Sequence, residues 1–447
     1  MNIINEFDTI TAISTPLGAG GVGVIRISGA KSFDILEKIF DGKTNVNKFK
    51  PSRFYHGYIK DGNDILDEVI VLPFFAPNSY TGENVCEIQC HGGVNVVNSI
   101  LSLVLKSGAR IAEKGEFTKR AFLNKKMDLS QAEAVADLIH AKTKDFVIPS
   151  SRNLKGALSI KVKEIRNEIF EVLSRIIAGI DFPDDVAEPE YDYLKTSFEN
   201  SIQNIDKILA GAGTSNIMRQ GISVAIAGKP NVGKSSLFNT LLNHERAIVT
   251  EIAGTTRDVI KETLDLGIPV TLIDTAGIRN DDGIDKVEQI GIEYSKNSLD
   301  EADCVLFVYD ATQGILDEDK KILDLINPNK LIVCANKSDI AKNETNELNI
   351  SAKTGDGIDE LKRILKTKVC DINPDEMDYV TNLRQQNCLM RAKEALQQAL
   401  EATEIHQLQD LISIDVKSAL LALDELSGEV ITDNILNNIF DNFCIGK

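Results

Sequence analysis

The sequence predicts a multidomain chain with an α+β N-terminal domain, a split all-α helical domain and an inserted α/β domain that carries a phosphate-binding loop. Short β-like runs punctuated by glycines fill the first 120 residues. Helical patterns with few breakers lie on both sides of the middle third, where strands instead alternate with helices. We therefore expect domains at residues 1–120, 121–219, 220–370 and 371–447, with the two helical segments forming one domain.

Composition limits the partners and the compartment. The 447 residues are 43% apolar and 26% charged, and the formal net charge is −18. A chain this acidic lacks the overall basic character of nucleic-acid-binding proteins, so an RNA substrate would need a basic partner or a local patch. The seven cysteines follow no disulfide spacing, and the sequence shows neither a signal peptide nor an apolar run of about 18–20 residues. We expect a cytoplasmic protein with reduced thiols that does not associate with membranes.

The N-terminal 120 residues are predicted to contain several strands and a helix. Apolar runs bounded by glycines and turn residues indicate the strands, and helical periodicity follows them. The predicted strands are residues 9–14, 23–28, 68–75 and 85–90, and the predicted helix is 94–107.

Both helical segments have apolar residues at helical spacing. The run Asp-Phe-Pro-Asp-Asp at 181–185 is a helix stop. One helical domain interrupted by an insertion is the economical interpretation, and two separate helical domains are the alternative. The predicted helices are 129–142, 153–177 and 193–209 before the insertion, and 377–402, 411–426 and 430–440 after it.

The middle third reads as a doubly wound α/β domain. Residues 228–235, Gly-Lys-Pro-Asn-Val-Gly-Lys-Ser, fit the pattern G-x-x-x-x-G-K-[ST] between a strand and a helix. The glycines let backbone N–H groups surround phosphate oxygens, Lys234 places a cation at the β- and γ-phosphates, and Ser235 ligates Mg²⁺. The predicted strands are 223–227, 270–273, 305–309, 331–335 and 348–351.

Three later motifs follow strands and indicate guanine specificity. Asp274 is placed to hold Mg²⁺ through water, and the Gly277 N–H can meet the γ-phosphate. The Asp339 carboxylate can accept both hydrogen bonds from the guanine N1–H and N2–H₂ groups, which adenine does not offer. The motifs are Asp-Thr-Ala-Gly at 274–277, Asn-Lys-Ser-Asp at 336–339 and Ser-Ala-Lys at 351–353.

The switch I position is occupied by Gly-Thr-Thr-Arg-Asp at 254–258, where Thr256 is the expected second Mg²⁺ ligand. This run resembles the Era-like class of GTPases. Ile278 stands where Ras-like proteins carry a glutamine, and its side chain cannot orient water by hydrogen bonding. Arg257 and Arg279 are candidate arginine fingers, but surface roles are at least as common for both. Another group must therefore neutralise charge in the transition state.

Three segments outside the nucleotide domain carry further motifs. They are Gly-Gly-Val-Gly-Val-Ile-Arg-Ile-Ser-Gly at 20–29, Tyr-Thr-Gly-Glu at 80–83 through Cys-His-Gly-Gly at 90–93 with Gly-Glu-Phe-Thr-Lys-Arg-Ala-Phe-Leu-Asn at 115–124, and Phe-Cys-Ile-Gly-Lys at 443–447. With these motifs the whole chain resembles the MnmE/TrmE family, which modifies uridine 34 of tRNA. The final Cys-Ile-Gly-Lys is the most specific signature, because ribosome-assembly relatives do not end this way.

The resemblance implies a layout and a reaction. An N-terminal folate-binding domain would dimerise, and the split helical domain would carry the GTPase domain. With a flavin-dependent partner of the MnmG/GidA family, as a heterotetramer, such a homodimer adds a carboxymethylaminomethyl or aminomethyl group to C5 of the wobble uridine in certain tRNAs. The carbon comes from 5-formyl- or methylene-tetrahydrofolate.

The resemblance also implies nucleotide-site residues. A K⁺ ion beside the phosphates would act where an arginine finger otherwise reaches. Glu288, in Val-Glu-Gln-Ile-Gly at 287–291, is the catalytic candidate and could act as a base through water; by spacing alone a solvated glutamate is the commoner outcome. The implied K⁺ ligands are Asn231, Thr250, Ile252 and Thr255. The implied GTP contacts are Gly228, Asn231, Val232, Gly233, Lys234, Ser235, Ser236, Thr250, Glu251, Ile252, Ala253, Gly254, Thr255, Thr256, Asp274, Thr275, Ala276, Gly277, Asn336, Lys337, Asp339, Ser351, Ala352 and Lys353.

For folate, the resemblance implies Arg26, Glu87 and Lys126, with Lys447 reaching the same site. Cations suit the glutamate-tail carboxylates of folate, and a carboxylate suits the donor edge of the pterin. Without the family, Arg26 and Glu87 would be read as charges on a strand surface. Cys444 is a candidate redox or nucleophilic residue, although a thiol near a chain end is often only exposed.

Two other functions stay open from the sequence. The first is an Era-like ribosome-assembly GTPase switch, which a basic RNA-binding appendage would favour. The second is a folate enzyme with a vestigial nucleotide domain, and the intact nucleotide motifs argue against it.

Overall fold

The computed structural model describes residues 8–244, 261–274, 299, 301–342, 347–370 and 377–447. Contacts divide the chain into unit 1, which comprises Met1–Ala136 and Asp424–Lys447, and unit 2, which comprises Asp137–Leu423. Residues 424–447 therefore pack with the N-terminal residues, whereas the sequence pattern assigned 371–447 as a whole to the helical domain. The four predicted domain boundaries stay predictions.

Unit 1 is an α+β structure. Its strands are β1 (Ile10–Ile13), β2 (Gly20–Ser28), β3 (Phe40–Gly42), β4 (Tyr55–Asp61), β5 (Asp64–Phe74), β6 (Val85–Gly92) and β7 (Arg110–Ile111). Its helices are α1 (Ser32–Ile39), the 3-10 helix η1 (Val46–Lys48), α2 (Val94–Lys106), α3 (Glu116–Leu123) and α15 (Asp433–Phe440). Helices α4 (Leu129–His140) and α14 (Gln409–Ser427) contain the two positions at which the units divide.

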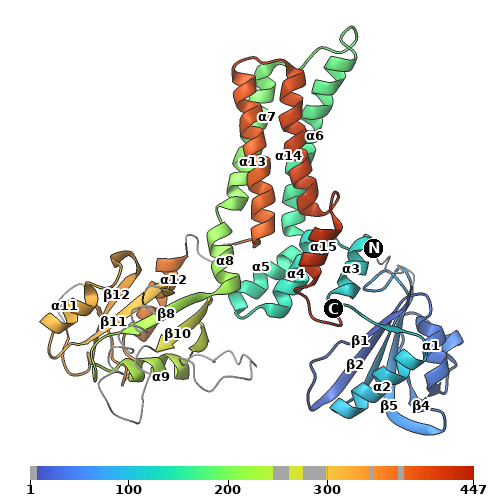
Figure 1. Ribbon diagram of the computed structural model, residues 1–447, viewed down its shortest axis with the longest axis horizontal. Coiled ribbons are helices and arrows are strands. Elements are labelled where there is room, and N and C mark those ends of the chain that lie inside the picture. Colours follow the sequence, from blue (N-terminus) through green and yellow to red (C-terminus); the bar gives the residue numbers. More distant parts are fainter. Residues whose placement is uncertain (1–7, 245–260, 275–298, 300, 343–346, 371–376) are drawn as a thin grey trace. The chain divides into compact units, whose positions relative to one another are not determined.

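The strands of unit 1 form one sheet in the order β3-β4-β5-β6-β2-β1-β7. Neighbouring strands are antiparallel except β1 and β7, which are parallel. Helices α1 and α2 lie against one face of the sheet (Figure 1). Ile25, Ile59 and Ile88 project into the core on that face and are fully buried. Alternation along each strand then places the other half of the side chains on the opposite face.

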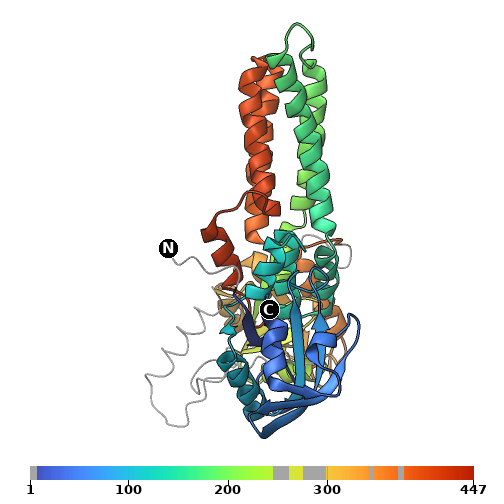
Figure 2. The ribbon, with the colours of Figure 1, turned by 90° about the vertical axis from the view of Figure 1, so that its right-hand side faces the viewer.

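The helical part of unit 2 is a bundle. Its helices are α5 (Lys144–Leu154), α6 (Ala157–Asp181), α7 (Tyr191–Leu209), α8 (Ala212–Gln220), α13 (Leu383–Glu404) and α14. Helix α6 buries Ile165, Ile169 and Ile176 along one stripe at helical spacing. Figures 1 and 2 show α6, α7, α13 and α14 side by side. Helices from before and after the insertion thus share one bundle, so the split helical domain is confirmed and two separate helical domains are wrong.

The inserted domain is a doubly wound α/β fold. It contains β8 (Ile222–Ala227), α9 (Lys234–His244), β9 (Lys261–Asp265), β10 (Pro269–Asp274), β11 (Cys304–Asp310), α11 (Asp317–Leu323), the 3-10 helix η2 (Pro328–Lys330), β12 (Leu331–Asn336), β13 (Leu348–Asn349) and α12 (Ile358–Val369). The strand order is β13-β12-β11-β8-β10-β9, and only β9 is antiparallel to its neighbour.

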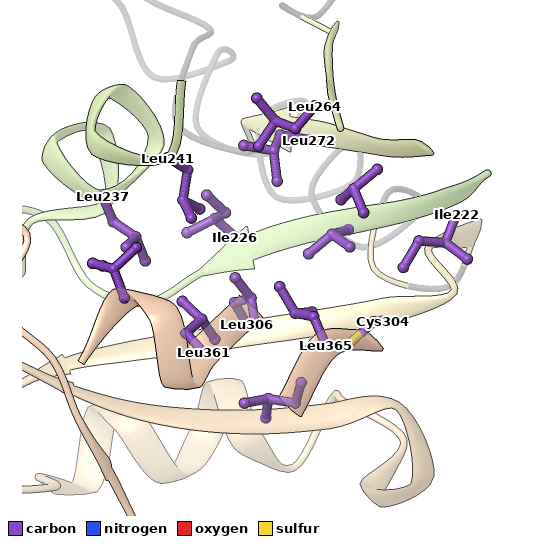
Figure 3. Close-up of a cluster of buried hydrophobic side chains, with 14 of the residues drawn as sticks. Ile222, Ile226, Leu237, Leu241, Leu264, Leu272, Cys304, Leu306, Leu361 and Leu365 are labelled. Atoms are coloured by element: carbon purple, nitrogen blue, oxygen red, sulfur yellow. The ribbon is translucent and has the colours of Figure 1, made fainter. Parts of the chain in front are cut away.

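Both faces of the central strand β8 are buried, as expected for a parallel sheet between helices. On one face Ile226 meets Leu237 of α9 and Leu361 of α12 (Figure 3). On the other face Ala225 joins a second cluster that includes residues packed from α11. Each fully buried leucine contributes roughly 1.5–3 kcal/mol to the free energy of unfolding. This packing holds the carboxyl ends of β8, β11 and β12 together at one edge, where the polar motifs begin.

Two helices outside the inserted domain extend its core. Phe146 of α5 and Met218 of α8 are buried in the same apolar cluster as Val224 and Leu272. Among the residues that the structure describes, no helix is long and apolar enough to cross a membrane.

Candidate functional site

The phosphate-binding loop connects β8 to α9. The Lys234 ammonium folds back over this loop and donates to the carbonyl oxygens of Gly228 at 2.7 Å and Lys229 at 2.8 Å. These contacts hold the cation at the N-terminal end of α9, where the helix dipole and backbone N–H groups also favour phosphate. These hydrogen bonds therefore hold the Lys234 ammonium where it can contact a polyphosphate.

Asn336, at the end of β12, ties three of the predicted motifs together. Its side chain is buried; Nδ2 donates to the carbonyl oxygen of Val232 at 2.8 Å, and Oδ1 accepts from the Ala352 N–H at 3.0 Å. Gly233 has φ +100°, and a Cβ there would clash with the Asn336 amide. The phosphate loop, the Asn-Lys-x-Asp segment and the Ser-Ala-Lys segment are thus locked to one another around one amide.

Asp339 and Ser351 form the part of the site that would read the base. The Ser351 hydroxyl donates to Asp339 Oδ1 at 2.7 Å, and Ser351 is fully buried. Its oxygen also accepts from the Thr354 N–H at 3.2 Å, which fixes the hydroxyl. The hydrogen bond from Ser351 thereby fixes the orientation of the Asp339 carboxylate. Lys353, which follows Ala352, is exposed.

Two acidic residues that the motifs did not predict, Asp310 of β11 and Asp319 of α11, pair with lysines of the site. Lys337, at φ +67°, donates to Asp310 Oδ2 at 2.6 Å. Burial alone would raise the Asp310 pKa, but hydrogen bonds from Lys337 and Thr312 outweigh it and hold the pKa below its ordinary value. Lys229 pairs with the buried Asp319 at 2.9 Å. The only sequence signal for Asp310 was its place at the end of an apolar strand.

A cavity of about 310 Å³ adjoins the phosphate loop. Asn231, at φ +64°, lines it together with Lys229 and Lys337. Asparagine is one of the few non-glycine residues that adopts this left-handed backbone readily. The remaining lining residues are Pro230, Val232, Asp310, Gln313, Gly314, Glu318 and Asp319.

The predicted Mg²⁺ residues are only partly described. Ser235 is exposed in the first turn of α9, and Ser236 follows it. Asp274 ends β10, where the backbone register places it beside Ile226 of β8. The other predicted nucleotide, ion and catalytic residues lie outside the described residues: Thr250, Glu251, Ile252, Ala253, Gly254, Thr255, Thr256, Thr275, Ala276, Gly277 and Glu288.

Unit 1 brings Arg26 and Glu87 together across β2 and β6. They are cross-strand neighbours, and the Arg26 guanidinium is 2.7 Å from Glu87 Oε1. The guanidinium also lies over the rings of Tyr80 and Phe117 at 5.4 and 5.5 Å from their centroids. Both charged side chains are largely buried, at 14% and 19% exposure. Arg26 and Glu87 are thus an enclosed ion pair flanked by aromatic rings and not two charges on an open strand surface.

Residues 444–447 close over this pair. The Gly446 carbonyl oxygen accepts from Arg26 Nη1 at 3.5 Å and from the Ser14 hydroxyl at 3.2 Å. The Phe117 N–H donates to the Lys447 carbonyl oxygen at 3.2 Å. Cys444 is exposed. Lys126 donates instead to the carbonyl oxygen of Pro77 at 2.9 Å, so its ammonium is engaged by that loop.

A Gly446→Ala variant is expected to loosen this segment. Gly446 has φ +96°, and an added Cβ would clash with the Ile13 carbonyl oxygen. A left-handed alanine alone costs about 1–2 kcal/mol, so amide exchange at Phe117 should accelerate roughly tenfold. Hydrogen exchange with mass spectrometry measures this, with the exposed Ile445→Ala as the control. Unchanged exchange in Gly446→Ala would contradict the seating described here.

The sheet, the phosphate loop and the Asn-Lys-x-Asp geometry define a P-loop GTPase of the Ras-like kind. Family models described as "GTP-binding protein TrmE N-terminus" and "MnmE helical domain" match residues 9–126 and 129–444. The tRNA modification GTPase MnmE of Thermoanaerobacter sp. is 43% identical over 99% of this chain and 100% of that protein. That of Carboxydothermus hydrogenoformans is 42% identical over 98% and 99%. The chain belongs to the MnmE/TrmE family of tRNA modification GTPases and is a GTP hydrolase.

Solved structures match parts of the chain. Aquifex aeolicus Era bound to GDP and AlF₄⁻ has 32% identity, covers 39% of this chain and 66% of that one, and gives a TM-score of 0.28. The G domain of the T. maritima FeoB iron transporter has 28% identity, covers 33% and 98%, and gives a TM-score of 0.25.

Proposed function

We propose that this GTPase acts with a flavin-dependent MnmG/GidA-family partner to add a carboxymethylaminomethyl or aminomethyl group to C5 of wobble uridine 34 in certain tRNAs. The observation that carries the proposal is the enclosed Arg26–Glu87 pair, which the Gly446 carbonyl oxygen also contacts, in a chain that has a separate nucleotide domain. GTP binding and hydrolysis alone do not require this pair. The protein would act as a homodimer in the cytoplasm.

The enclosed pair suits tetrahydrofolate, as its 5-formyl or methylene derivative. When bound, this cofactor supplies the one-carbon unit. The Glu87 carboxylate can accept from the donor edge of a pterin, and Arg26 can bind a carboxylate of the glutamate tail. Tyr80 and Phe117 provide flat apolar surface beside the pair. Lys126 and Lys447 would take outer positions in this proposal.

In the nucleotide site, Lys234 would bind the β- and γ-phosphates, and Ser235 and Thr256 would hold Mg²⁺. Asn231 lines the cavity beside the loop and offers an amide oxygen, a hard donor that suits K⁺. Thr250, Ile252 and Thr255 would complete the ion's ligands. A bound cation supplies positive charge to the transition state, and Glu288 would orient or deprotonate the attacking water.

GTP hydrolysis is therefore expected to be more than about tenfold faster in KCl than in NaCl of equal ionic strength. An arginine finger contributes roughly 10³–10⁵ to such rates, so even partial replacement by K⁺ gives a large effect. Phosphate release at saturating GTP and Mg²⁺ measures it, and Asn231→Ala should remove most of the difference between the salts. Equal rates for the unchanged protein in both salts would exclude the K⁺ role.

Mass analysis of wobble uridines tests the proposed function as a whole. tRNA from cells lacking this protein should contain unmodified uridine at position 34 where tRNA from the parent contains the modified base. Intact modification in those cells would overturn the proposal. The Era-like ribosome-assembly alternative instead predicts normal wobble uridines and abnormal ribosomal subunits, and it has less support because the family matches extend well beyond the nucleotide domain.

A further inference from the structure

Residues 43–60 of unit 1 break with the charge of the rest of the chain. They contain Lys43, Lys48, Lys50, Arg53 and Lys60 and no carboxylate, in a protein whose net charge is −18. The first four are exposed. Only Lys60 has a carboxylate partner among the ion pairs of the described residues, and that partner is Asp41. A segment with this concentration of positive charge, in an otherwise acidic protein, indicates a local binding surface for an anionic partner.

The loop that carries these cations is held rigid. Asn45 caps η1 by accepting from the Asn47 N–H at 2.9 Å. The rings of Phe49 and Tyr55 stack at 3.7 Å with an angle of 8° between their planes. The Tyr55 hydroxyl also accepts from the Lys50 N–H at 2.7 Å. These contacts order the backbone from which the charged side chains extend, which lowers the entropy cost of binding a ligand.

Three exposed rings follow the loop at alternate positions. Phe54 is 69% exposed, Tyr58 is 38% exposed, and the side chain of His56 between them is 57% exposed. Alternation along β4 places His56 and Tyr58 on one face, while Gly57 and Ile59 are buried toward the helices. Phe54 directly precedes the strand. We call Phe54, His56 and Tyr58 the aromatic row. Exposed rings that gather on one face are typical of interaction surfaces, whereas single exposed rings are common.

The aromatic row shares its sheet face with the Arg26–Glu87 pair. Arg26 is opposite Glu87, and Glu87 is opposite Leu72. On β4, His56 is opposite Ile70, and Ile70 lies two residues from Leu72 on β5, so both project to the same face. Directly opposite residues project to the same face, and three strand spacings amount to about 14 Å. A ligand stacked on the aromatic row would thus lie on the same face as Arg26, about three strand spacings away.

Few carboxylates oppose these groups. Tyr58 has a carboxylate opposite it on each neighbouring strand, Asp41 of β3 and Glu68 of β5. Asp41 pairs with Lys60, and Glu68 is 2.7 Å from His56. Glu37 of α1 accepts from the Asn47 amide at 2.6 Å. The acidic residues Asp61 and Asp64 are at the far end of the β4–β5 hairpin, about 20 Å from Tyr55. The loop end of β4 therefore stays positive.

We propose that this surface binds single-stranded RNA. Lys43, Lys48, Lys50 and Arg53 contact phosphates, and bases stack on Phe54 and Tyr58. Aromatic rings beside a basic track bind unpaired nucleotides in this way, because every base has a face to stack and every nucleotide a charge. The inference rests on the proposed tRNA substrate and assigns it a docking surface. A second copy of this chain fits less well, since a two-fold contact through this patch would set like charges against each other.

Binding of an unmodified tRNA transcript to the full chain tests the surface. At about 0.1 M salt, the triple variant K48E/K50E/R53E should bind the tRNA at least tenfold more weakly than the unchanged protein. The slope of log K against log salt concentration should be shallower by about two. The matched control is K163E/K321E/K417E, which makes the same charge change at exposed lysines of unit 2. The control should keep most of the affinity, because the effect is local.

Phe54→Ala tests stacking without a charge change. Base–aromatic stacking predicts a loss of about 5- to 100-fold in tRNA affinity with an unchanged salt slope. The exposed Leu408→Ala is the control. Equal affinity of the triple variant and its control, or no measurable binding by the unchanged protein at low salt, would overturn the proposal. So would a change of sedimentation coefficient in K48E/K50E/R53E with tRNA affinity retained, which would mark the patch as a contact between copies. Wobble-uridine analysis reports separately on the proposed function.

Discussion

An Asp339→Asn variant is expected to lose GTP affinity by roughly 10²–10⁴. Each charge-assisted hydrogen bond to a guanine N–H contributes about 1.5–3 kcal/mol, and the substitution removes the acceptor from at least one and weakens the other. The Ser351 hydroxyl, 2.7 Å from Asp339 Oδ1, holds the side chain in its reading orientation. An asparagine held there offers an N–H₂ group to the base and so faces the guanine donors with a donor.

Xanthosine triphosphate provides the decisive comparison. Xanthine has a carbonyl where guanine has its 2-amino group, so the variant should prefer it to GTP while the unchanged protein prefers GTP. Fluorescent-nucleotide binding measures both affinities. The control is Asp356→Asn, in the same loop. The Asp356 carboxylate is exposed and, in the described contacts, pairs only with Thr354, so this change should leave the preference for GTP over xanthosine triphosphate unaltered. A variant that still prefers GTP would refute the assignment of Asp339.

An Asn336→Ala variant is expected to lose both stability and nucleotide affinity. The change strips partners from the buried Val232 carbonyl oxygen and the Ala352 N–H, at about 1–3 kcal/mol for each group left unsatisfied. A total near 2–5 kcal/mol is large beside the ~5–15 kcal/mol of a typical domain. The phosphate loop and the base-reading segment would also separate, so GTP binding should weaken more than about tenfold.

Thermal unfolding of the full chain, with and without GTP, measures this effect. The midpoint of the nucleotide-domain transition should fall by several degrees, and saturating GTP should restore less of it than in the unchanged protein. Asn329→Ala changes an exposed asparagine in η2 and serves as the control. If Asn336→Ala had the same unfolding midpoint and the same GTP affinity as the control, the hydrogen bonds of Asn336 would not be needed for either property.

The polar motifs of the nucleotide site could be read from the sequence because each follows a buried strand. Parallel strands bring their carboxyl ends to one edge, so order along the chain predicted that Asn336, Asp339 and Ser351 would meet. The structure brings Asn336 to Val232 and Ala352, and Asp339 to Ser351. The pairing of Asp310 with Lys337 and of Asp319 with Lys229 was not predictable, since isolated acidic residues carry no periodic signal.

Several elements escaped prediction for physical reasons. Strand β9 is charged, as an edge strand can be, and so shows no apolar run. Helix α5 contains Pro149, which reads as a breaker, yet the chain is helical there and the predicted helix 153–177 is instead divided between α5 and α6. Strand β4 was missed because Gly57 and the exposed Tyr58 weaken its alternation. That same exposure is what marks it as a surface for a partner.

The shared bundle imposes an order on synthesis. Helices α6 and α7 leave the ribosome first, but α13, which packs along α7, follows only after the whole nucleotide domain. At about 5–20 residues per second this delay is on the order of ten seconds or more. During that time the residues that α7 buries in the finished bundle, among them Leu194, Phe198 and Ile205, lack α13 beside them. The bundle can therefore close only after the inserted domain has been synthesised, so its assembly is among the last steps in making the chain.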